Sequence, residues 1–229
     1  MAGRPRALIF DFDGVIADSE PLHLAAFQRT LAADGIGLSR EAYYARYLGF
    51  DDHDAIVEAL RGAGRVPDPA RVQALMAAKA AAFLELVRTG APLLPGVPAF
   101  VRAAAARVPL AIASGALGRE ILLVLAHAGL ADAFVTVVSA EDVRAGKPSP
   151  EGFLLACERL RARVPALAAA DCLVIEDSPP GVEGARRAGM RCVAVTNSAS
   201  AGELAGADLV VSSLAGLAWE RLAALWGAS

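Results

Sequence analysis

Six short runs of apolar residues recur along the chain, and segments with helical spacing separate most of them. The runs, many of them rich in β-branched residues, are Ala7 to Phe10, Leu110 to Ala113, Phe134 to Val138, Cys172 to Ile175, Cys192 to Val195 and Leu209 to Val211. The helical segments include Arg119 to Ala128, Pro150 to Arg161 and Gly181 to Ala188. This alternation predicts an α/β fold with a Rossmann-like parallel-sheet core and helices on both faces.

One interval, from Asp18 to Gly90, breaks this rhythm. It shows Ala-rich helical patterning without a convincing strand, interrupted at 35–37, 62–64 and 67–69. Ser19 followed by Pro21 is typical of a helix start, and the proline-rich stretch from Pro92 to Pro98 is typical of a domain boundary. The sequence therefore predicts an α/β core domain made of residues 1–17 and 91–229, and an inserted α-helical cap domain made of residues 18–90.

Composition narrows the classes of partner. The net charge is −3 and the basic residues are scattered along the chain, so no electrostatic footprint for nucleic acid is present. The hydrophobic fraction is 55%, but the longest stretch without Asp, Glu, Lys or Arg runs only from Thr89 to Val101 and contains prolines, too short for a membrane helix. The apolar run before Asp11 is also too short for a signal peptide.

The cysteines indicate the redox environment. Cys157, Cys172 and Cys192 are odd in number, widely spaced and without histidines at metal-ligand spacing, which favours reduced core residues. We therefore expect a cytoplasmic protein, a monomer or homodimer, with a small-molecule partner and neither nucleic acid nor membrane as a partner.

Polar residues suited to phosphate or metal chemistry follow four of the six runs. Asp11 and Asp13 follow the first, Ser114-Gly115 the second, Lys147 the third after a short loop, and Glu176-Asp177 the fourth. The carboxyl ends of parallel strands share one edge of a sheet, where such folds bind ligands. Taken singly, the first acid pair could be a solvated turn, Ser114-Gly115 a turn and Glu176-Asp177 acids at a helix start. Their joint occurrence favours one site.

Lysine is rare in this chain, which has 22 basic residues but only two lysines, Lys79 and Lys147. Lys147 lies between Gly146 and Pro148. A surface position is the simple alternative, but a lysine in a chain that otherwise uses arginine suggests a need for a compact point charge.

Four segments resemble, in order, the four motifs of the haloacid dehalogenase-like hydrolase superfamily. They are Asp11-Phe12-Asp13-Gly14-Val15, Ile112-Ala113-Ser114-Gly115, Gly146-Lys147-Pro148-Ser149-Pro150 and Glu176-Asp177-Ser178-Pro179-Pro180-Gly181. The helical insert after the first motif resembles the cap of the subgroup that contains phosphoglycolate phosphatases, sugar-phosphate phosphatases and β-phosphoglucomutases. The resemblance extends from Arg6 to about Val211.

The resemblance implies phosphoryl transfer through an aspartyl-phosphate. Asp11 would attack the phosphorus, and Asp13 would protonate the leaving oxygen and later take a proton from water. Mg²⁺ would be held by Asp11, the backbone carbonyl of Asp13 and Asp177, with Glu176 close by or acting through water.

The resemblance also implies which residues would bind the substrate. Ser114, the amide of Gly115 and Lys147 would hold the transferring oxygens, where negative charge develops. His23, at the start of the cap helix, could help couple substrate binding to cap closure, or could be an ordinary helix-surface histidine. The cap would close over the site and exclude water.

Departures from the family patterns separate the possible reactions. Dehalogenases of the superfamily lack an aspartate at the position of Asp13, and phosphonatases have a small residue there. The presence of Asp13 therefore argues against dehalogenase activity and against phosphonatase activity. The alternative is β-phosphoglucomutase, because 14–19, Leu22-His23 and Glu176-Asp177-Ser178 resemble its motifs, yet the stretch Leu48-Gly49-Phe50-Asp51-Asp52-His53 is acidic where that cap is basic. Asp51, Asp52 and His53 could accept hydrogen bonds from substrate hydroxyls, but we expect them to form a solvated loop. A non-catalytic binding module is a third class, against which the intact acid pair argues. The sequence therefore predicts a Mg²⁺-dependent phosphatase acting on a small phosphorylated metabolite, either a sugar phosphate or a phosphoglycolate-like compound.

Overall fold

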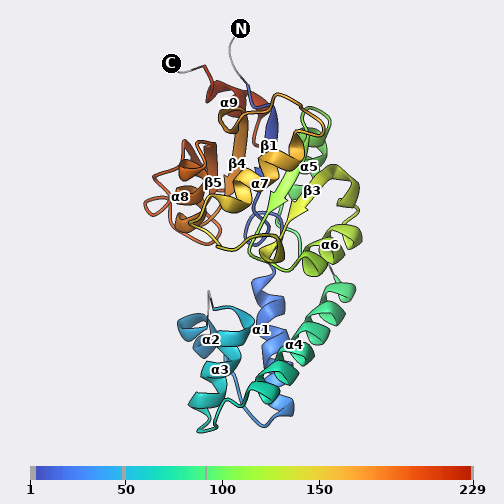
Figure 1. Ribbon diagram of the computed structural model, residues 1–229, viewed down its shortest axis with the longest axis vertical. Coiled ribbons are helices and arrows are strands. Elements are labelled where there is room, and N and C mark those ends of the chain that lie inside the picture. Colours follow the sequence, from blue (N-terminus) through green and yellow to red (C-terminus); the bar gives the residue numbers. More distant parts are fainter. Residues whose placement is uncertain (1–3, 48–49, 91, 228–229) are drawn as a thin grey trace. The chain divides into compact units, whose positions relative to one another are not determined.

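The computed structural model describes residues 4–47, 50–90 and 92–227. Contacts within the chain divide it into two compact units, a core unit of Met1–Asp18 with Ala91–Ser229 and a helical unit of Ser19–Gly90 (Figure 1). The first break lies one residue beyond the position expected from the sequence.

Within the described residues, the core unit contains a six-stranded sheet in the order β3-β2-β1-β4-β5-β6, in which every neighbouring pair is parallel. The strands are β1 (Ala7–Phe10), β2 (Leu110–Ala113), β3 (Phe134–Val138), β4 (Cys172–Glu176), β5 (Arg191–Val195) and β6 (Leu209–Val211). This confirms the predicted α/β class. Glu176 and Arg191 each extend a predicted strand by one residue.

Helices cover both faces of this sheet. Ala7 and Ile9 belong to an apolar cluster with residues of α7 (Glu151–Leu160) and α8 (Pro179–Arg187). Successive strand residues point to opposite faces, and the Phe10 ring contacts Phe100 of α5 (Val97–Ala105) at 6.1 Å between centroids. The other core elements are α6 (Gly118–His127), α9 (Trp219–Ala224) and the short 3₁₀ turns Ala131–Ala133, Ala140–Asp142 and Ala169–Asp171.

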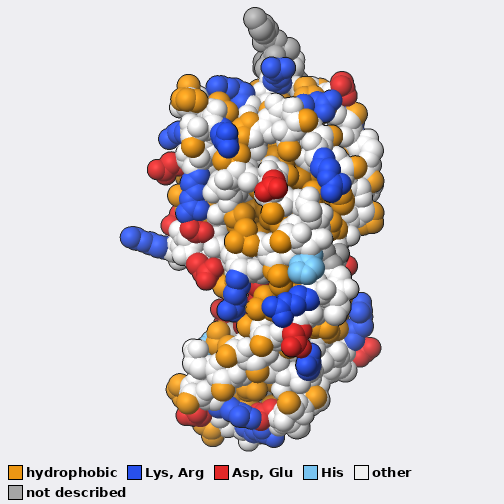
Figure 2. All heavy atoms as spheres, turned by 90° about the vertical axis from the view of Figure 1, so that its right-hand side faces the viewer, with side chains coloured by type: hydrophobic (Ala, Val, Ile, Leu, Met, Phe, Trp, Pro, Cys, Tyr) orange, Lys and Arg blue, Asp and Glu red, His pale blue; other side chains and the backbone are white. Residues whose placement is uncertain are grey.

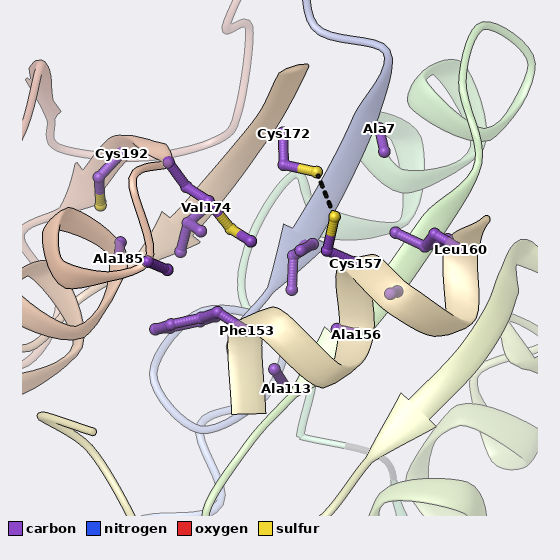
Figure 3. Close-up of a cluster of buried hydrophobic side chains, with 14 of the residues drawn as sticks. Ala7, Ala113, Phe153, Ala156, Cys157, Leu160, Cys172, Val174, Ala185 and Cys192 are labelled. Atoms are coloured by element: carbon purple, nitrogen blue, oxygen red, sulfur yellow. Dashed lines mark hydrogen bonds between the residues drawn. The ribbon is translucent and has the colours of Figure 1, made fainter. Parts of the chain in front are cut away.

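The cluster under α7 also holds all three cysteines. Figure 3 shows Cys157 on α7 facing Cys172 at the start of β4, and their sulfur atoms are 3.7 Å apart. Cys157, Cys172 and Cys192 are all free thiols buried in the core, as the sequence predicts. Burial raises the pKa of the Cys172 thiol, which makes it a poor nucleophile.

The helical unit contains α1 (Glu20–Ala33), α2 (Arg40–Arg46), α3 (Asp52–Gly62) and α4 (Pro69–Thr89). Side-chain oxygens of Ser39, Asp51 and Asp68 accept hydrogen bonds from the first turns of α2, α3 and α4, which explains where these helices begin. An apolar cluster that includes Phe27, Leu31, Ile56 and Leu60 forms the unit's own core.

One local prediction for this unit was wrong. The stretch 51–53, expected to be a solvated loop, instead begins α3, because the Asp51 side chain accepts a hydrogen bond from the amide of Asp54 at 2.8 Å. Acidic residues are also favourable in the first turn of a helix. Leu48 and Gly49, part of the same sequence stretch, lie outside the described residues.

Surface charge is mixed. On the face drawn in Figure 2, Lys and Arg side chains are interspersed with acidic and apolar ones rather than gathered in one continuous patch. The chain as a whole has a net charge of −3. Among the helices that the structure describes, none combines the length and the apolar character needed to cross a membrane.

Candidate active site

The carboxyl-terminal edge of the sheet gathers the seven core residues that the sequence singled out. The amide of Asp11 donates to the carbonyl of Ile175 at 2.9 Å, which holds the end of β1 beside the end of β4. The amide of Ser114 donates to the carbonyl of Val138 at 3.0 Å, which joins the ends of β2 and β3. Strand pairing and the contacts of Lys147 together gather Asp11, Asp13, Ser114, Gly115, Lys147, Glu176 and Asp177.

Lys147 links two of the acids. Its Nζ lies 2.6 Å from Asp11 Oδ1 and 2.5 Å from Glu176 Oε1. Burial by itself lowers the pKa of Lys147, but the charges of Asp11 and Glu176 more than offset this, so the pKa lies above its ordinary value. The ammonium group also lies 5.2 Å from the ring centroid of Phe153 on α7. Lys147 is therefore a fixed positive charge rather than a mobile surface residue.

Glu176 is completely buried, and both its carboxylate oxygens are engaged. Oε1 pairs with Lys147, while Oε2 accepts from the amides of Asp177 and Ser178 at 2.8 and 3.0 Å and from the Ser178 hydroxyl at 2.9 Å. A Cβ at Gly181 would collide with this carboxylate, so the glycine leaves the space that Glu176 occupies. Glu176 therefore orients Lys147 and the turn between β4 and α8.

Asp177 is buried beside the turn that follows β1. Gly14, with φ of 74°, leaves no room for a Cβ, which would overlap Asp177 Oδ2. The hydroxyl of Ser198 donates to the same oxygen. Burial raises the pKa of Asp177 to about 6, with the charges of Glu176 and Asp13 adding to the rise, while the Ser198 hydrogen bond and Lys147 oppose it.

The acids fit a divalent cation. Oxygen atoms of Asp11, Glu176 and Asp177 lie within 4.8 Å of one another, and all three residues are buried. Burial raises the pKa of Asp11 to about 8; Lys147 opposes this, and Glu176 and Asp13 add to it. The cluster thus holds more carboxylates than Lys147 can neutralise, and an all-oxygen donor set of this kind suits Mg²⁺. The half-buried Asp13 lies in a backbone bridge with Ala17, next to this cluster.

Ser114 and Gly115 border a cavity of about 410 Å³ beside Lys147. The Ser114 oxygen accepts from the amide of Ala116 at 3.1 Å, which leaves the hydroxyl hydrogen to donate to a ligand. In the described part of the chain, the Gly115 amide has no hydrogen-bond acceptor. The cavity can therefore offer an anion two neutral donors and one ammonium group.

His23 lies on α1 in the helical unit. Its ring stacks on Phe83 with 4.3 Å between centroids, and Nδ1 lies 2.8 Å from Lys79 Nζ, which also pairs with Asp52 at 2.6 Å. Burial and then the Lys79 charge lower the pKa of His23 to about 3, so the ring is neutral. His23 is not an ordinary surface residue, and its role toward the substrate stays a prediction.

Sequence reasoning missed two residues that follow β5. Ser198 binds Asp177, and the Asn197 side chain donates to the carbonyl of Gly14 at 2.7 Å. Their position just after the fifth apolar run is the signal that predicts them, as it is for the polar residues that follow the first four runs.

The fold and the site together define an α/β enzyme whose acidic, lysine-containing centre lies at the edge of a parallel sheet. The family described as haloacid dehalogenase-like hydrolase matches residues 5–189, and the chain belongs to that family. It is a hydrolase of the capped group that the motifs resemble.

Individual relatives match over nearly their whole length. The protein CbbY of Rhodobacter capsulatus is 30% identical over 225 residues, which cover 95% of this chain and 97% of the relative. The fructose-1-phosphate phosphatase YqaB of Escherichia coli is 33% identical over 196 residues, covering 85% and 98% of the two chains. The crystal structure of CbbY from Rhodobacter sphaeroides in complex with xylulose-(1,5)bisphosphate has a TM-score of 0.79 and 28% identity, covering 93% and 96%.

Proposed function

We propose that this chain is a Mg²⁺-dependent phosphatase that hydrolyses a small phosphomonoester, a sugar phosphate or a phosphoglycolate-like compound, through an aspartyl-phosphate. The observation that carries the proposal is the buried contact of Asp11 with Lys147, next to Glu176 and Asp177. Relatives named as a fructose-1-phosphate phosphatase and a phosphoglycolate phosphatase, and a solved relative in complex with a sugar bisphosphate, support the substrate class.

Asp11 and Asp13 divide the chemistry between them. In the first step an oxygen of Asp11 bonds to phosphorus while the bond from phosphorus to the ester oxygen breaks, and Asp13 gives its proton to that leaving oxygen. In the second step Asp13 takes a proton from water, whose oxygen attacks the phosphorus and releases Asp11 and inorganic phosphate. One difficult displacement is thereby replaced by two easier ones.

The surrounding residues bind the charge that moves during these steps. Lys147, the Ser114 hydroxyl and the Gly115 amide would hold the transferring oxygens, and Glu176 keeps Lys147 in place. Asp11, Asp177 and the backbone carbonyl of Asp13 would hold Mg²⁺, with Glu176 as a neighbour that contributes through its hydrogen bonds. When bound, Mg²⁺ would reduce the repulsion between the nucleophile and the phosphate and stabilise charge on the transferring oxygens.

The test is a screen of phosphorylated metabolites for release of inorganic phosphate, with and without Mg²⁺. We expect hydrolysis of small sugar phosphates or phosphoglycolate-like acids, its loss on chelation with EDTA, and its recovery when Mg²⁺ is returned. The variant Asp171→Asn is a suitable control, because Asp171 belongs to a partly exposed pair with Arg6 and is not among the proposed site residues. Inactivity of the wild type across the whole screen with Mg²⁺ would contradict the proposal.

The same screen distinguishes a phosphatase from a phosphosugar mutase. β-Glucose 1-phosphate is supplied with a trace of the bisphosphate, and glucose 6-phosphate and free phosphate are measured together. We expect free phosphate to form faster from the best substrate than the 6-phosphate forms from β-glucose 1-phosphate. The reverse order would assign the chain to the phosphosugar mutases instead.

A further inference from the structure

The loop after β5 reaches the same sheet edge as the proposed catalytic residues. In the parallel pairing of β4 with β5, Glu176 lies opposite Ala194, so the segments that follow these two strands leave the sheet side by side. Asp177 continues from β4, while Thr196, Asn197 and Ser198 continue from β5. The loop therefore lies next to the part of the site that carries the acids.

Ser198 and Gly14 approach one carboxylate oxygen from two sides. Ser198 Oγ donates to Asp177 Oδ2, and a Cβ placed on Gly14 would meet both that oxygen and Ser198 Oγ. Asp177 has a short side chain with two rotatable bonds, and a hydrogen bond to one oxygen fixes the direction of the other. The orientation of Asp177 is thus set from outside its own loop.

Asn197 anchors the loop that carries Ser198. Its Nδ2 donates to the Gly14 carbonyl at 2.7 Å, and its own amide donates to the Val195 carbonyl at 2.9 Å. The loop is therefore tied both to β5 and to the turn that follows Asp13. Because of these two ties, the Ser198 hydroxyl stays close to Asp177.

We infer that Ser198 is a positioning residue for a divalent cation, holding Asp177 in the orientation that a metal ligand needs; this inference rests on the proposed function. Carboxylates that bind metals are themselves commonly held by hydrogen bonds, and loss of such a partner typically weakens metal binding about 10- to 100-fold. Ser198 does not touch the reacting atoms in this account. It acts through Asp177.

The experiment measures Mn²⁺ binding directly, by calorimetric titration of metal-free protein without substrate. We expect Ser198→Ala to raise the dissociation constant about 10- to 100-fold, while Ser198→Thr, which keeps the hydroxyl, stays near wild type. Ser200→Ala is the matched control, because the Ser200 hydroxyl donates to Glu203 at 2.5 Å in the same loop but does not contact Asp177. In turnover assays Ser198→Ala needs more metal, and its kcat recovers at saturating metal.

The outcomes separate the two proposals. Wild-type affinity in Ser198→Ala, or equal losses in Ser198→Ala and Ser198→Thr, overturns the positioning role and leaves the phosphatase proposal standing. A wild-type protein that hydrolyses phosphomonoesters but binds no divalent cation overturns both the positioning role and the metal dependence. Thermal unfolding of each variant checks that the fold is intact; Ser198 is exposed, so loss of folding is not expected.

Discussion

The chain's only two lysines lie in buried polar clusters of opposite character. In the core unit, Lys147 meets the carboxylates of Asp11 and Glu176, and its side chain remains 20% exposed at the border of a cavity. In the helical unit, Lys79 is 1% exposed and meets one carboxylate, Asp52, and the neutral ring of His23. The aromatic rings of Phe27 and Phe83 also lie within 5.4 Å of the Lys79 ammonium group.

This difference shows how a buried charge can serve either reactivity or folding. Around Lys147 the carboxylates outnumber the ammonium group, and the raised pKa values of Asp11 and Asp177 show that their ionised forms lack sufficient positive charge, which is the charge that the proposed divalent cation would supply. Around Lys79 one ammonium group faces one carboxylate, and aromatic faces and a neutral imidazole complete its surroundings. The first cluster borders a cavity, whereas the second, the closed cluster, surrounds the Lys79 ammonium group with side chains of the helical unit.

The largest effect is expected for Lys147→Met. The substitution removes the ammonium group that binds the transferring oxygens and leaves Glu176 buried without its cation, so we expect kcat/KM to fall at least about a thousandfold. Phosphate release under saturating Mg²⁺ measures the loss. Lys147→Arg is the matched control: it restores charge but not the compact shape, and should recover only part of the activity. Near-wild-type activity in Lys147→Met would show that the two lysine clusters do not differ in the way described.

A smaller effect, on stability rather than chemistry, is expected for Lys79→Met. Methionine fills a similar volume but cannot form the ion pair with Asp52. The Asp52 side chain is 25% exposed and can be hydrated instead, so the unfolding free energy should fall by only about 1 to 3 kcal/mol. Urea unfolding followed by circular dichroism measures it. Arg29→Met, which breaks the exposed pair with Glu85, should cost less than about 1 kcal/mol. Equal losses in the two variants would remove the distinction between a closed cluster and a surface ion pair.

The smallest effect at neutral pH, where it vanishes, is a pH dependence that comes from His23. Its pKa is lowered from 6.5 to about 3, so below pH 6.5 the unfolded chain takes up a proton that the folded chain does not. Stability should therefore fall with decreasing pH between about 6.5 and 3, by up to about 1.4 kcal/mol per pH unit from this group. His23→Asn keeps an acceptor for Lys79 but cannot titrate, so the slope of unfolding free energy against pH should decrease. An unchanged slope would contradict the closed environment assigned to this histidine.

The core unit and the helical unit also differ in how much of their structure could be predicted from the sequence. The strands of the core were predicted almost to the residue, because strands buried on both faces are continuous apolar runs bounded by polar turns. Glu176 was left outside its strand because a carboxylate does not usually end a buried run. It does so here because Lys147 and Ser178 satisfy both its oxygens.

The helical unit was harder to predict, because its polar contacts join residues far apart in the sequence. Lys79 is separated from His23 by 56 positions and from Asp52 by 27, and no local sequence pattern predicts either contact. The position of Ser198 after the fifth apolar run could have been predicted, but its pairing with Asp177, 21 positions earlier, could not. Sequence motifs identify candidate reactive residues, whereas the residues that orient them are distant in the sequence and are identified only in the folded structure.

The proposed function depends most on Asp11 as the nucleophile that forms the aspartyl-phosphate, and the variant Asp11→Asn tests this role most directly. Asparagine preserves the shape of the side chain but cannot act as the nucleophile, so Mg²⁺-dependent hydrolysis should fall at least about 10,000-fold, while Asp171→Asn keeps wild-type activity. The measurement is phosphate release from the best substrate, using protein freed of contaminating phosphatase. Metal-dependent hydrolysis retained in Asp11→Asn would contradict the account.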